Sequence, residues 1–451
     1  MVTLTFYGGV NEIGGNKFLL EGKKTRIFLD FGKNFSREKR FFEEPFIKAR
    51  EEKHLLALKI LPNIDGLYEK DEKKYHLDGV IITHPHTDHY DCIRFLKDDY
   101  PVYCGEATKN IIVAREFSSQ SIGEGYNICK LTSREEIVCK DFRTFRTGDT
   151  VEISNFKVTP VHVDHSVPAS YGFILETNEG NIVYSGDLRM HGPMMNMTLD
   201  FLEKAKSFEP EVLLIEGTHI GACKIESEEE VFNKVERIIS LTEKLVLAGF
   251  SQTDFDRLRT FYEAAKNNDR KLGVSMKQAY MLHMLRKDPK LELPKLNDPN
   301  ILIFAREKKS LREYEKRIRE TYPENIIDSK EINKIQEELV LVCTLYDMNE
   351  MIDIRPEAGS NYILSSSEPF DEEMEISYEK LLNWLEFLGI PLYQTHASGH
   401  ASPHEIKYMI REISPRKVFP IHTERPELFK KFISDLDVEV ILPEEGKKYD
   451  F

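Results

Sequence analysis

The first part of the chain consists of short apolar and β-branched runs, each ended by turn residues. Runs of roughly 4 to 8 such residues between Gly, Asn or Asp predict β-strands. The first three runs lie close together, which predicts antiparallel strands joined by short turns. We expect strands at residues 3–7, 17–20, 26–30, 78–83, 156–163, 171–176, 181–185 and 212–216.

Residues 34–76 interrupt this pattern because they are dense in Lys, Glu and Phe. Within them, residues 46–61 have apolar positions at helical spacing, so we predict an inserted helical arm. A second helix is expected over residues 88–96, soon after the predicted strand 78–83.

The pattern changes after Glu216. Apolar runs there are mostly separated by charged segments of helical length, such as residues 252–268 and 307–322. This alternation predicts right-handed crossovers and a parallel sheet covered by helices on both faces. The strands expected in this part are 245–249, 271–275, 300–304, 338–343 and 361–365. Residues 391–451 add two strand candidates, 418–420 and 438–442.

The chain has 451 residues, a length that corresponds to two to four domains at about 100–200 residues each. Its formal net charge of −15 argues against a protein that coats nucleic acid or a basic membrane surface binder, but it allows a local basic groove. The apolar runs are only of strand length and no signal peptide pattern is present, so we expect a cytoplasmic protein without membrane segments. Six cysteines without a CxxC pair predict neither a disulfide scaffold nor a Cys-based zinc finger.

Histidine carries the strongest chemical signal. Three histidines and one carboxylate follow the predicted strand 78–83, namely His84, His86, Asp88 and His89. Pro85 and Thr87 disfavour a regular helix, which places the first two histidines on a loop. Burying these groups without partners would be costly, whereas neutral imidazole and carboxylate are good zinc ligands. The alternative is a solvated His-rich turn. The position of this motif directly after a predicted strand favours metal binding over that alternative.

Four potential ligands this close together in sequence do not fit well around a single tetrahedral ion, which indicates two ions. Two-metal sites hold their ions about 3.5–4 Å apart and stabilise the attacking and leaving oxygens of a displacement. The other ligands must then come from distant strand ends. The candidates are His162, His165, Asp187 and His422, each of which taken singly also fits a structural role.

The run 84–89 resembles the signature of the metallo-β-lactamase fold, and later residues match the remaining ligands of that fold in order. By this resemblance, His84, His86 and His165 hold one ion, Asp88, His89 and His422 hold the other, and Asp187 bridges them. Zn²⁺ is the expected metal for both positions, and Mn²⁺ is a substitute. His162 lacks the His-Ser-x-Pro pattern that begins at His165, so we interpret it as a supporting or structural residue.

Three further motifs resemble those of the β-CASP family, the nucleic-acid-processing members of this fold. Glu216 lies in LIEGT, which resembles the acidic motif at which these proteins insert a second domain. Residues 396–402, HASGHAS, resemble their second motif, and residues 420–424, PIHTE, resemble their third. Residues 8–16, GGVNEIGGN, are similar to the start of ribonuclease J-type enzymes. The implied fold is α/β: a metallo-β-lactamase αββα sandwich with an inserted doubly wound α/β β-CASP domain. The expected domains are 1–218 with the helical arm at about 34–76, the β-CASP domain 219–385, and a return segment 386–451.

Some positions depart from the family pattern. Pro85 stands where Gly is common, Ala169 where Asp is usual, and Thr423 where Gly is usual. None of these changes removes a ligand. The chain ends soon after His422, so we expect no extra C-terminal domain of the kind many ribonuclease J proteins carry.

The family pattern also implies catalytic roles. Asp88 would orient or deprotonate the attacking water, His400 would protonate the leaving group, and Glu216 would orient His400. Glu216 as a simple cap of the following segment is the alternative. The small residues around His400 offer backbone N–H groups to a phosphate, although an ordinary turn explains them equally well. The phosphate or RNA contacts considered are Ser398, Gly399, His400, Ala401 and, more weakly, Ser366.

The sequence therefore predicts a two-metal-dependent ribonuclease that hydrolyses phosphodiester bonds of single-stranded RNA in exonucleolytic mode, endonucleolytic mode or both. Three alternatives remain open: a DNA nuclease of the same family, a small-molecule metallo-hydrolase, and a non-catalytic RNA-binding subunit. The inserted domain and the motif around His400 argue against a simple hydrolase, and the intact ligand set argues against a non-catalytic subunit. The oligomeric state is not determined, and a homodimer is one of the states considered.

Overall fold

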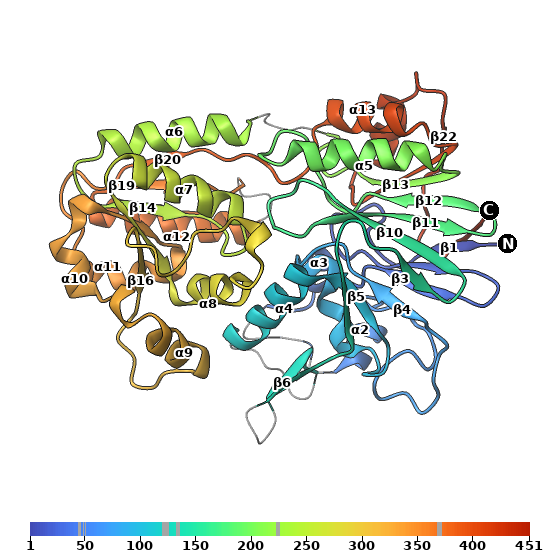
Figure 1. The fold of residues 1–451 in the computed structure, drawn as a ribbon, viewed down its shortest axis with the longest axis horizontal. Coiled ribbons are helices and arrows are strands. Elements are labelled where there is room, and N and C mark those ends of the chain that lie inside the picture. The colour runs from blue at the N-terminus through green and yellow to red at the C-terminus, as the bar shows by residue number, and fades with distance from the viewer. Residues whose placement is uncertain are drawn as a thin grey trace. The chain divides into compact units, whose positions relative to one another are not determined.

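The computed structural model describes residues 1–43, 47, 49, 51–119, 126–131, 136–221, 226–367 and 372–451. The chain forms two compact units (Figure 1). The first unit comprises Met1–Met190, Met194–Cys223 and Gly399–Phe451, and the second comprises His191–Pro193 and Lys224–Ser398. The domain ranges that the sequence suggested, 1–218, 219–385 and 386–451, stay a prediction.

Two mixed sheets, each of seven strands among the described residues, build the first unit. In the first sheet, β23, β1, β2 and β3 pair antiparallel, whereas β3, β4, β5 and β8 pair in parallel. Its strands are β23 (Lys448–Asp450), β1 (Thr3–Phe6), β2 (Phe18–Glu21), β3 (Arg26–Leu29), β4 (Gly79–Ile81), β5 (Val102–Gly105) and β8 (Phe142–Phe145).

The second sheet changes from parallel to antiparallel pairing at β12. β22, β21, β13 and β12 are parallel, and β12, β11, β10 and β9 are antiparallel. The strands are β22 (Glu439–Val440), β21 (Lys417–Ile421), β13 (Val212–Glu216), β12 (Gly180–Tyr184), β11 (Tyr171–Thr177), β10 (Phe156–His162) and β9 (Val151–Ile153). The helices of this unit are α1 (Phe35–Glu38), α2 (Glu52–Ala57), α3 (Thr87–Tyr90), α4 (Glu106–Ser118), α5 (Met195–Ser207), α13 (Pro403–Ile413) and α14 (Pro426–Phe432).

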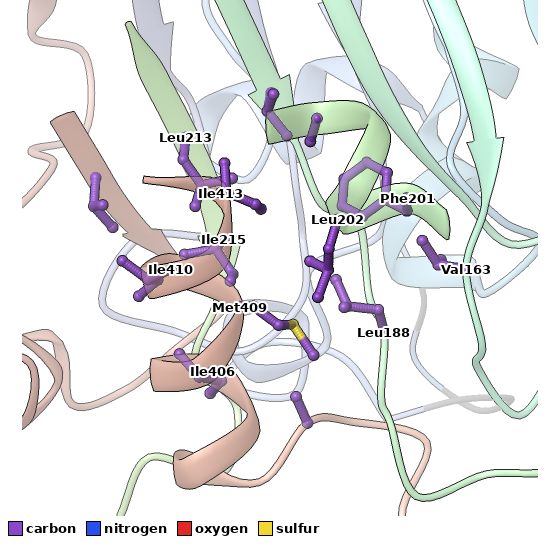
Figure 2. Packing of buried hydrophobic residues seen from close by; sticks show 14 of the residues in the cluster. Val163, Leu188, Phe201, Leu202, Leu213, Ile215, Ile406, Met409, Ile410 and Ile413 are labelled. Carbon is purple, nitrogen blue, oxygen red and sulfur yellow. The ribbon is translucent and has the colours of Figure 1, made fainter. Parts of the chain in front are cut away.

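Helices α5 and α13 cover the second sheet side by side (Figure 1). Their apolar faces meet β13 in a core, part of which is shown in Figure 2. In α13, Ile406, Met409, Ile410 and Ile413 recur at the three- and four-residue spacing that places them on one face. Ser402 caps this helix by accepting a hydrogen bond from the Glu405 N–H, while the Glu405 carboxylate accepts one from Ser402 N. The start of α13, directly after His400, is thereby fixed.

The predicted helical arm contains only short helices among the described residues. The helix expected over 46–61 is found as α2, Glu52–Ala57, and residues 44–46, 48 and 50 lie outside the described part. The helix ends because Lys59 takes a left-handed conformation, with φ 56°, and Pro62 follows.

The paired strands β6 (Cys129–Leu131) and β7 (Ile137–Cys139) carry a disulfide between Cys129 and Cys139, a local cross-link that the sequence did not predict.

The second unit contains one parallel sheet of seven described strands in the order β17-β16-β15-β18-β14-β19-β20. All of its strand pairs are parallel, which confirms the predicted combination of a mixed two-sheet part with a parallel-sheet part. The strands are β14 (Val246–Gly249), β15 (Lys271–Ser275), β16 (Ile301–Phe304), β17 (Ile326–Ile327), β18 (Leu339–Val342), β19 (Asn361–Leu364) and β20 (Leu392–Gln394). The helices are α6 (Glu228–Leu241), α7 (Phe255–Asn267), α8 (Met276–Leu285), α9 (Glu313–Thr321), α10 (Ser329–Lys334), α11 (Met351–Ile354) and α12 (Glu372–Leu388).

Within the described residues, no helix has both the length and the apolar character needed to cross a membrane.

The core between α13 and the second sheet yields a stability prediction. Met409→Ala removes a side chain that is 1% exposed and should lower the free energy of unfolding by about 2–5 kcal/mol, because a cavity remains. Met197→Ala in α5 is the matched control: its side chain is 37% exposed, so the loss should stay below about 1 kcal/mol. Urea unfolding followed by circular dichroism measures both, and equal losses would contradict the packing described here.

Candidate metal centre

Parallel strand pairing brings distant parts of the chain to one edge of the second sheet. β13 lies between β12 and β21 and is parallel to both, with Glu216 opposite Ile421. Glu216 ends β13, while Asp187 and His422 come just after β12 and β21. Because the carboxyl ends of parallel strands meet at the same edge, these three side chains converge. His84 follows β4 of the first sheet, and His165 follows β10.

The first group of metal-binding candidates is His84, His86, His165 and Asp187, whose ligand atoms all lie within 4.8 Å of one another. His84 Nε2 lies 3.0 Å from His86 Nδ1, and His165 Nε2 lies 3.1 Å from the same atom. Asp187 Oδ2 is 3.6 Å from His84 Nε2. Three nitrogens and one oxygen at this spacing fit the ligand shell of a single zinc ion.

The second group consists of Asp88, His89 and His422. His422 Nε2 lies 3.1 Å from Asp88 Oδ2, and His89 Nε2 lies 3.7 Å from it. Asp187 Oδ2 also reaches this group, at 3.0 Å from His89 Nε2 and 3.9 Å from His422 Nε2. The same Asp187 oxygen therefore lies within reach of both groups. A third combination, Asp187 with His400 and His422, also has the spacing of a metal site.

The protonation states of the first group suit metal binding. Burial lowers the pKa of His84 well below its usual value, and the neighbouring His89 lowers it further. Burial also lowers the pKa of His86 to about 4 and that of His165 well below the usual range. At neutral pH these three imidazoles are therefore neutral, which is the form that binds a metal ion.

Two carboxylates, Asp88 of the second group and the buried Asp187 of the first, face the histidines of the second group. Burial raises the pKa of Asp88, but His89 and His422 outweigh it and hold that pKa well below its usual value. The pKa of Asp187 behaves in the same way, since His422 and His89 outweigh the effect of burial. Buried carboxylate charge is stable only when paired with positive charge, so this part of the cluster favours a cation.

Asp30, directly after β3, supports the cluster from behind and was missed by the sequence reasoning. Its carboxylate accepts hydrogen bonds from Thr83 N at 2.8 Å, Thr83 Oγ1 at 2.9 Å and Tyr184 Oη at 2.6 Å. His89 Nδ1 lies 2.7 Å from the same carboxylate. Asp30 thus orients the His89 ring so that Nε2 faces the cluster, a common arrangement behind metal-binding histidines. An acid at the end of an apolar strand was the available signal.

The glycine-rich segment 8–16 lies against the second group. Asn16 N donates to the Asp88 carbonyl at 3.1 Å, and Asn16 Nδ2 is 3.1 Å from His89 Nε2. His422 N donates to the Gly9 carbonyl at 2.8 Å. Gly14 has φ +81°, and a Cβ there would come within 3.0 Å of the Asp88 side chain, so the close approach requires glycine.

His400 and Glu216 form a hydrogen-bonded pair beside the cluster. His400 Nδ1 lies 3.1 Å from both oxygens of the fully buried Glu216 carboxylate. Burial alone would lower the pKa of His400, but the Glu216 and Asp187 carboxylates raise it to about 9. The ring of His219 lies 5.9 Å from that of His400. The alternative role of Glu216, as a cap of the following segment, has weak support: Thr218 N donates a long hydrogen bond of 3.4 Å to its carboxylate.

The candidate phosphate contacts divide between the two units. Gly399 and Ala401 belong to the first unit, and Ser398 and Ser366 to the second. The Gly399 carbonyl oxygen lies 2.5 Å from His165 Nδ1, and Ala401 N is 3.4 Å from Glu216, so both backbone groups face the metal centre. Their role toward a phosphate stays a prediction. His162 stacks on Tyr171 and belongs to none of the three metal-binding groups.

Two family models match the chain. Residues 67–233 match a beta-lactamase superfamily domain, and residues 392–443 match a Zn-dependent metallo-hydrolase RNA specificity domain. These segments include every residue of the three metal-binding groups.

Similar proteins cover almost the whole chain. Ribonuclease J of Mycoplasma genitalium is 26% identical over 93% of this chain and 67% of its own length, and ribonuclease J2 of Bacillus subtilis is 24% identical over 94% and 69%. Ribonuclease J of Helicobacter pylori strain J99 is 23% identical over 94% of this chain and 56% of its own. A crystal structure of a protein of unknown function from Enterococcus faecalis V583 shares the fold, with a TM-score of 0.77, 23% identity and 99% coverage of both chains.

Asp30 provides a test of the support behind the cluster. Asp30→Asn replaces one acceptor oxygen by an NH₂ group that faces buried donors, which should cost about 1–3 kcal/mol for each donor left without an acceptor. It should also weaken metal binding by about 10–100-fold. Asp437→Asn, at an exposed position, is the isosteric control and should change neither quantity. Calorimetric metal titration and thermal unfolding measure the two effects, and wild-type values for Asp30→Asn would contradict the support role.

Proposed function

Because the chain matches a beta-lactamase superfamily domain and an RNA specificity domain of Zn-dependent metallo-hydrolases, we propose that it is a two-metal ribonuclease acting on single-stranded RNA. One observation carries this proposal: seven His and Asp donors converge in two groups next to the His400–Glu216 pair. The donors and the pair all belong to the first unit.

The donor chemistry fits two Zn²⁺ ions, and Mn²⁺ is the alternative metal. His84, His86 and His165 would hold one ion and Asp88, His89 and His422 the other, with Asp187 shared between them. When bound, such a pair of ions offsets the charge on the phosphoryl oxygens and activates water for attack. Asp88 is proposed to orient that water in addition to its role as a ligand.

His400 is proposed as the general acid that protonates the leaving oxygen. Its Nδ1–H donates to the Glu216 carboxylate, which fixes the ring and leaves Nε2 to carry the transferable proton. The His400 pKa of about 9 means that this proton is present at neutral pH. Glu216 therefore acts on the leaving group through His400 and is an orienting residue.

RNA is favoured over DNA because the matched RNA specificity domain spans both His400 and His422. The similar proteins that are named ribonuclease J support the same choice. In the proposal, the backbone around Gly399 and Ala401, together with Ser398 and Ser366, contributes contacts to the RNA phosphates. Exonucleolytic and endonucleolytic cleavage are both compatible with this chemistry.

The central prediction concerns the ligands. Purified protein should hold about two metal ions and degrade single-stranded RNA. His86→Ala and Asp88→Ala should abolish cleavage, because each removes a donor from one of the two groups. His76→Ala, whose side chain is 62% exposed, is the control and should retain full activity.

The assay should compare end-labelled RNA and DNA oligomers, each with a 5′-phosphate or a 5′-hydroxyl. Mononucleotide products indicate exonucleolytic cleavage, and internal fragments indicate endonucleolytic cleavage. Preferential cleavage of DNA would refute the choice of substrate, and full RNA cleavage by Asp88→Ala would refute the mechanism.

The role of His400 can be separated from metal binding by the choice of leaving group. His400→Ala should reduce RNA cleavage by about 10²–10⁴-fold, because a ribose oxygen leaves poorly without a proton. Bis(p-nitrophenyl) phosphate has a leaving group that needs no proton, so its hydrolysis should change far less. If His400→Ala instead loses both activities together with bound metal, His400 is a ligand with Asp187 and His422, and the acid assignment is wrong.

A further inference from the structure

The hydroxyl group of Thr218 lies between the His400–Glu216 pair and the proposed metal ligand His422. Its Oγ1 is 2.6 Å from Glu216 Oε2, 2.9 Å from His422 Nδ1 and 3.3 Å from His400 Nδ1. All four residues belong to the first unit.

The direction of each hydrogen bond follows from counting protons. A hydroxyl group has one proton and two acceptor lone pairs, and a carboxylate only accepts. Four possible acceptors surround the Thr218 proton: Glu216 Oε2 at 2.6 Å, His422 Nδ1 at 2.9 Å, His400 Nδ1 at 3.3 Å and the His422 carbonyl at 3.3 Å. The shortest contact, to the charged acceptor, is the strongest one, so Thr218 donates to Glu216.

His422 must then be the donor in its contact with Thr218. Since the hydroxyl proton is already used, the 2.9 Å contact requires a proton on His422 Nδ1. The other ring nitrogen, Nε2, lies 3.1 Å from Asp88 Oδ2 and is the atom left to bind a metal ion. The hydroxyl group selects the tautomer in which His422 presents a ligand atom to the second group.

We propose that Thr218 is a positioning residue that fixes the tautomer and ring orientation of His422 and links that ligand to Glu216. This inference rests on the proposed function, because it assigns His422 to an ion of the two-metal site. Glu216 consequently supports two histidines, His400 directly and His422 through Thr218.

Removal of the hydroxyl group has a specific consequence. In Thr218→Val a methyl group takes its place and excludes water from that position, so the proton on His422 Nδ1 loses its acceptor. His422 is 1% exposed, so the ring cannot turn to solvent, and the tautomer with the proton on Nε2 becomes competitive. That tautomer does not bind a metal ion through Nε2.

The experiment uses the full-length protein and three variants. In Thr218→Val, the second Zn²⁺ equivalent should bind about 10–100-fold more weakly than in wild type, while the first is unchanged. Thr218→Ser restores the hydroxyl group and should restore wild-type affinity. Thr5→Val is the matched control, because Thr5 is a buried threonine of the same unit whose hydroxyl has no hydrogen-bond partner. It should leave both affinities unchanged.

A second measurement is independent of the stability of the variants. Long-range ¹H–¹⁵N NMR spectra of ¹⁵N-histidine-labelled wild-type protein loaded with Zn²⁺ should show His422 protonated at Nδ1, with His422→Gln used for assignment. A proton on Nε2, or unchanged binding of both ions by folded Thr218→Val, would overturn the role of Thr218 alone. A wild-type protein that binds fewer than two Zn²⁺ ions would overturn the proposed function and this inference with it.

Discussion

Parallel pairing of β13 with β21 is the interaction on which the metal centre depends. The pairing aligns Val212 through Glu216 with Lys417 through Ile421 in an unbroken register. It therefore sets Glu216 beside the residue that precedes His422, although most of the second unit lies between them in the chain. A slip of one residue would turn every side chain of the strand to the opposite face and separate the two groups.

Around this pairing, each buried charge is matched by a fixed partner. Asp30 holds His89 from behind, Glu216 holds His400, and Thr218 joins Glu216 to His422. Such matching is needed because a buried carboxylate without a partner would cost several kcal/mol. The site is therefore built as two layers: donors that face a common point, and acceptors behind them that fix the orientation of each ring.

Much of this centre could be predicted from local sequence. His84, His86, Asp88 and His89 form a compact motif, and His165, Asp187 and His422 followed from a resemblance in chain order. The contacts of Asp30 with His89 and of Thr218 with His422 could not be predicted in the same way, because these partners are distant in sequence and meet only after the sheets form. In the predicted arm, the helical spacing of residues 46–61 was outweighed by the left-handed backbone at Lys59.

The ends of the long insertion, Lys224–Ser398, lie near the His400–Glu216 pair in the sequence. The chain leaves the first unit after Cys223, close to Thr218, and returns at Gly399, next to His400. The hydrogen bonds between Glu216, Thr218 and His400 thus connect the residues that flank the two ends of a long insertion. Since the entropy of closing a loop grows only slowly with its length, the insertion can change in size at little energetic cost.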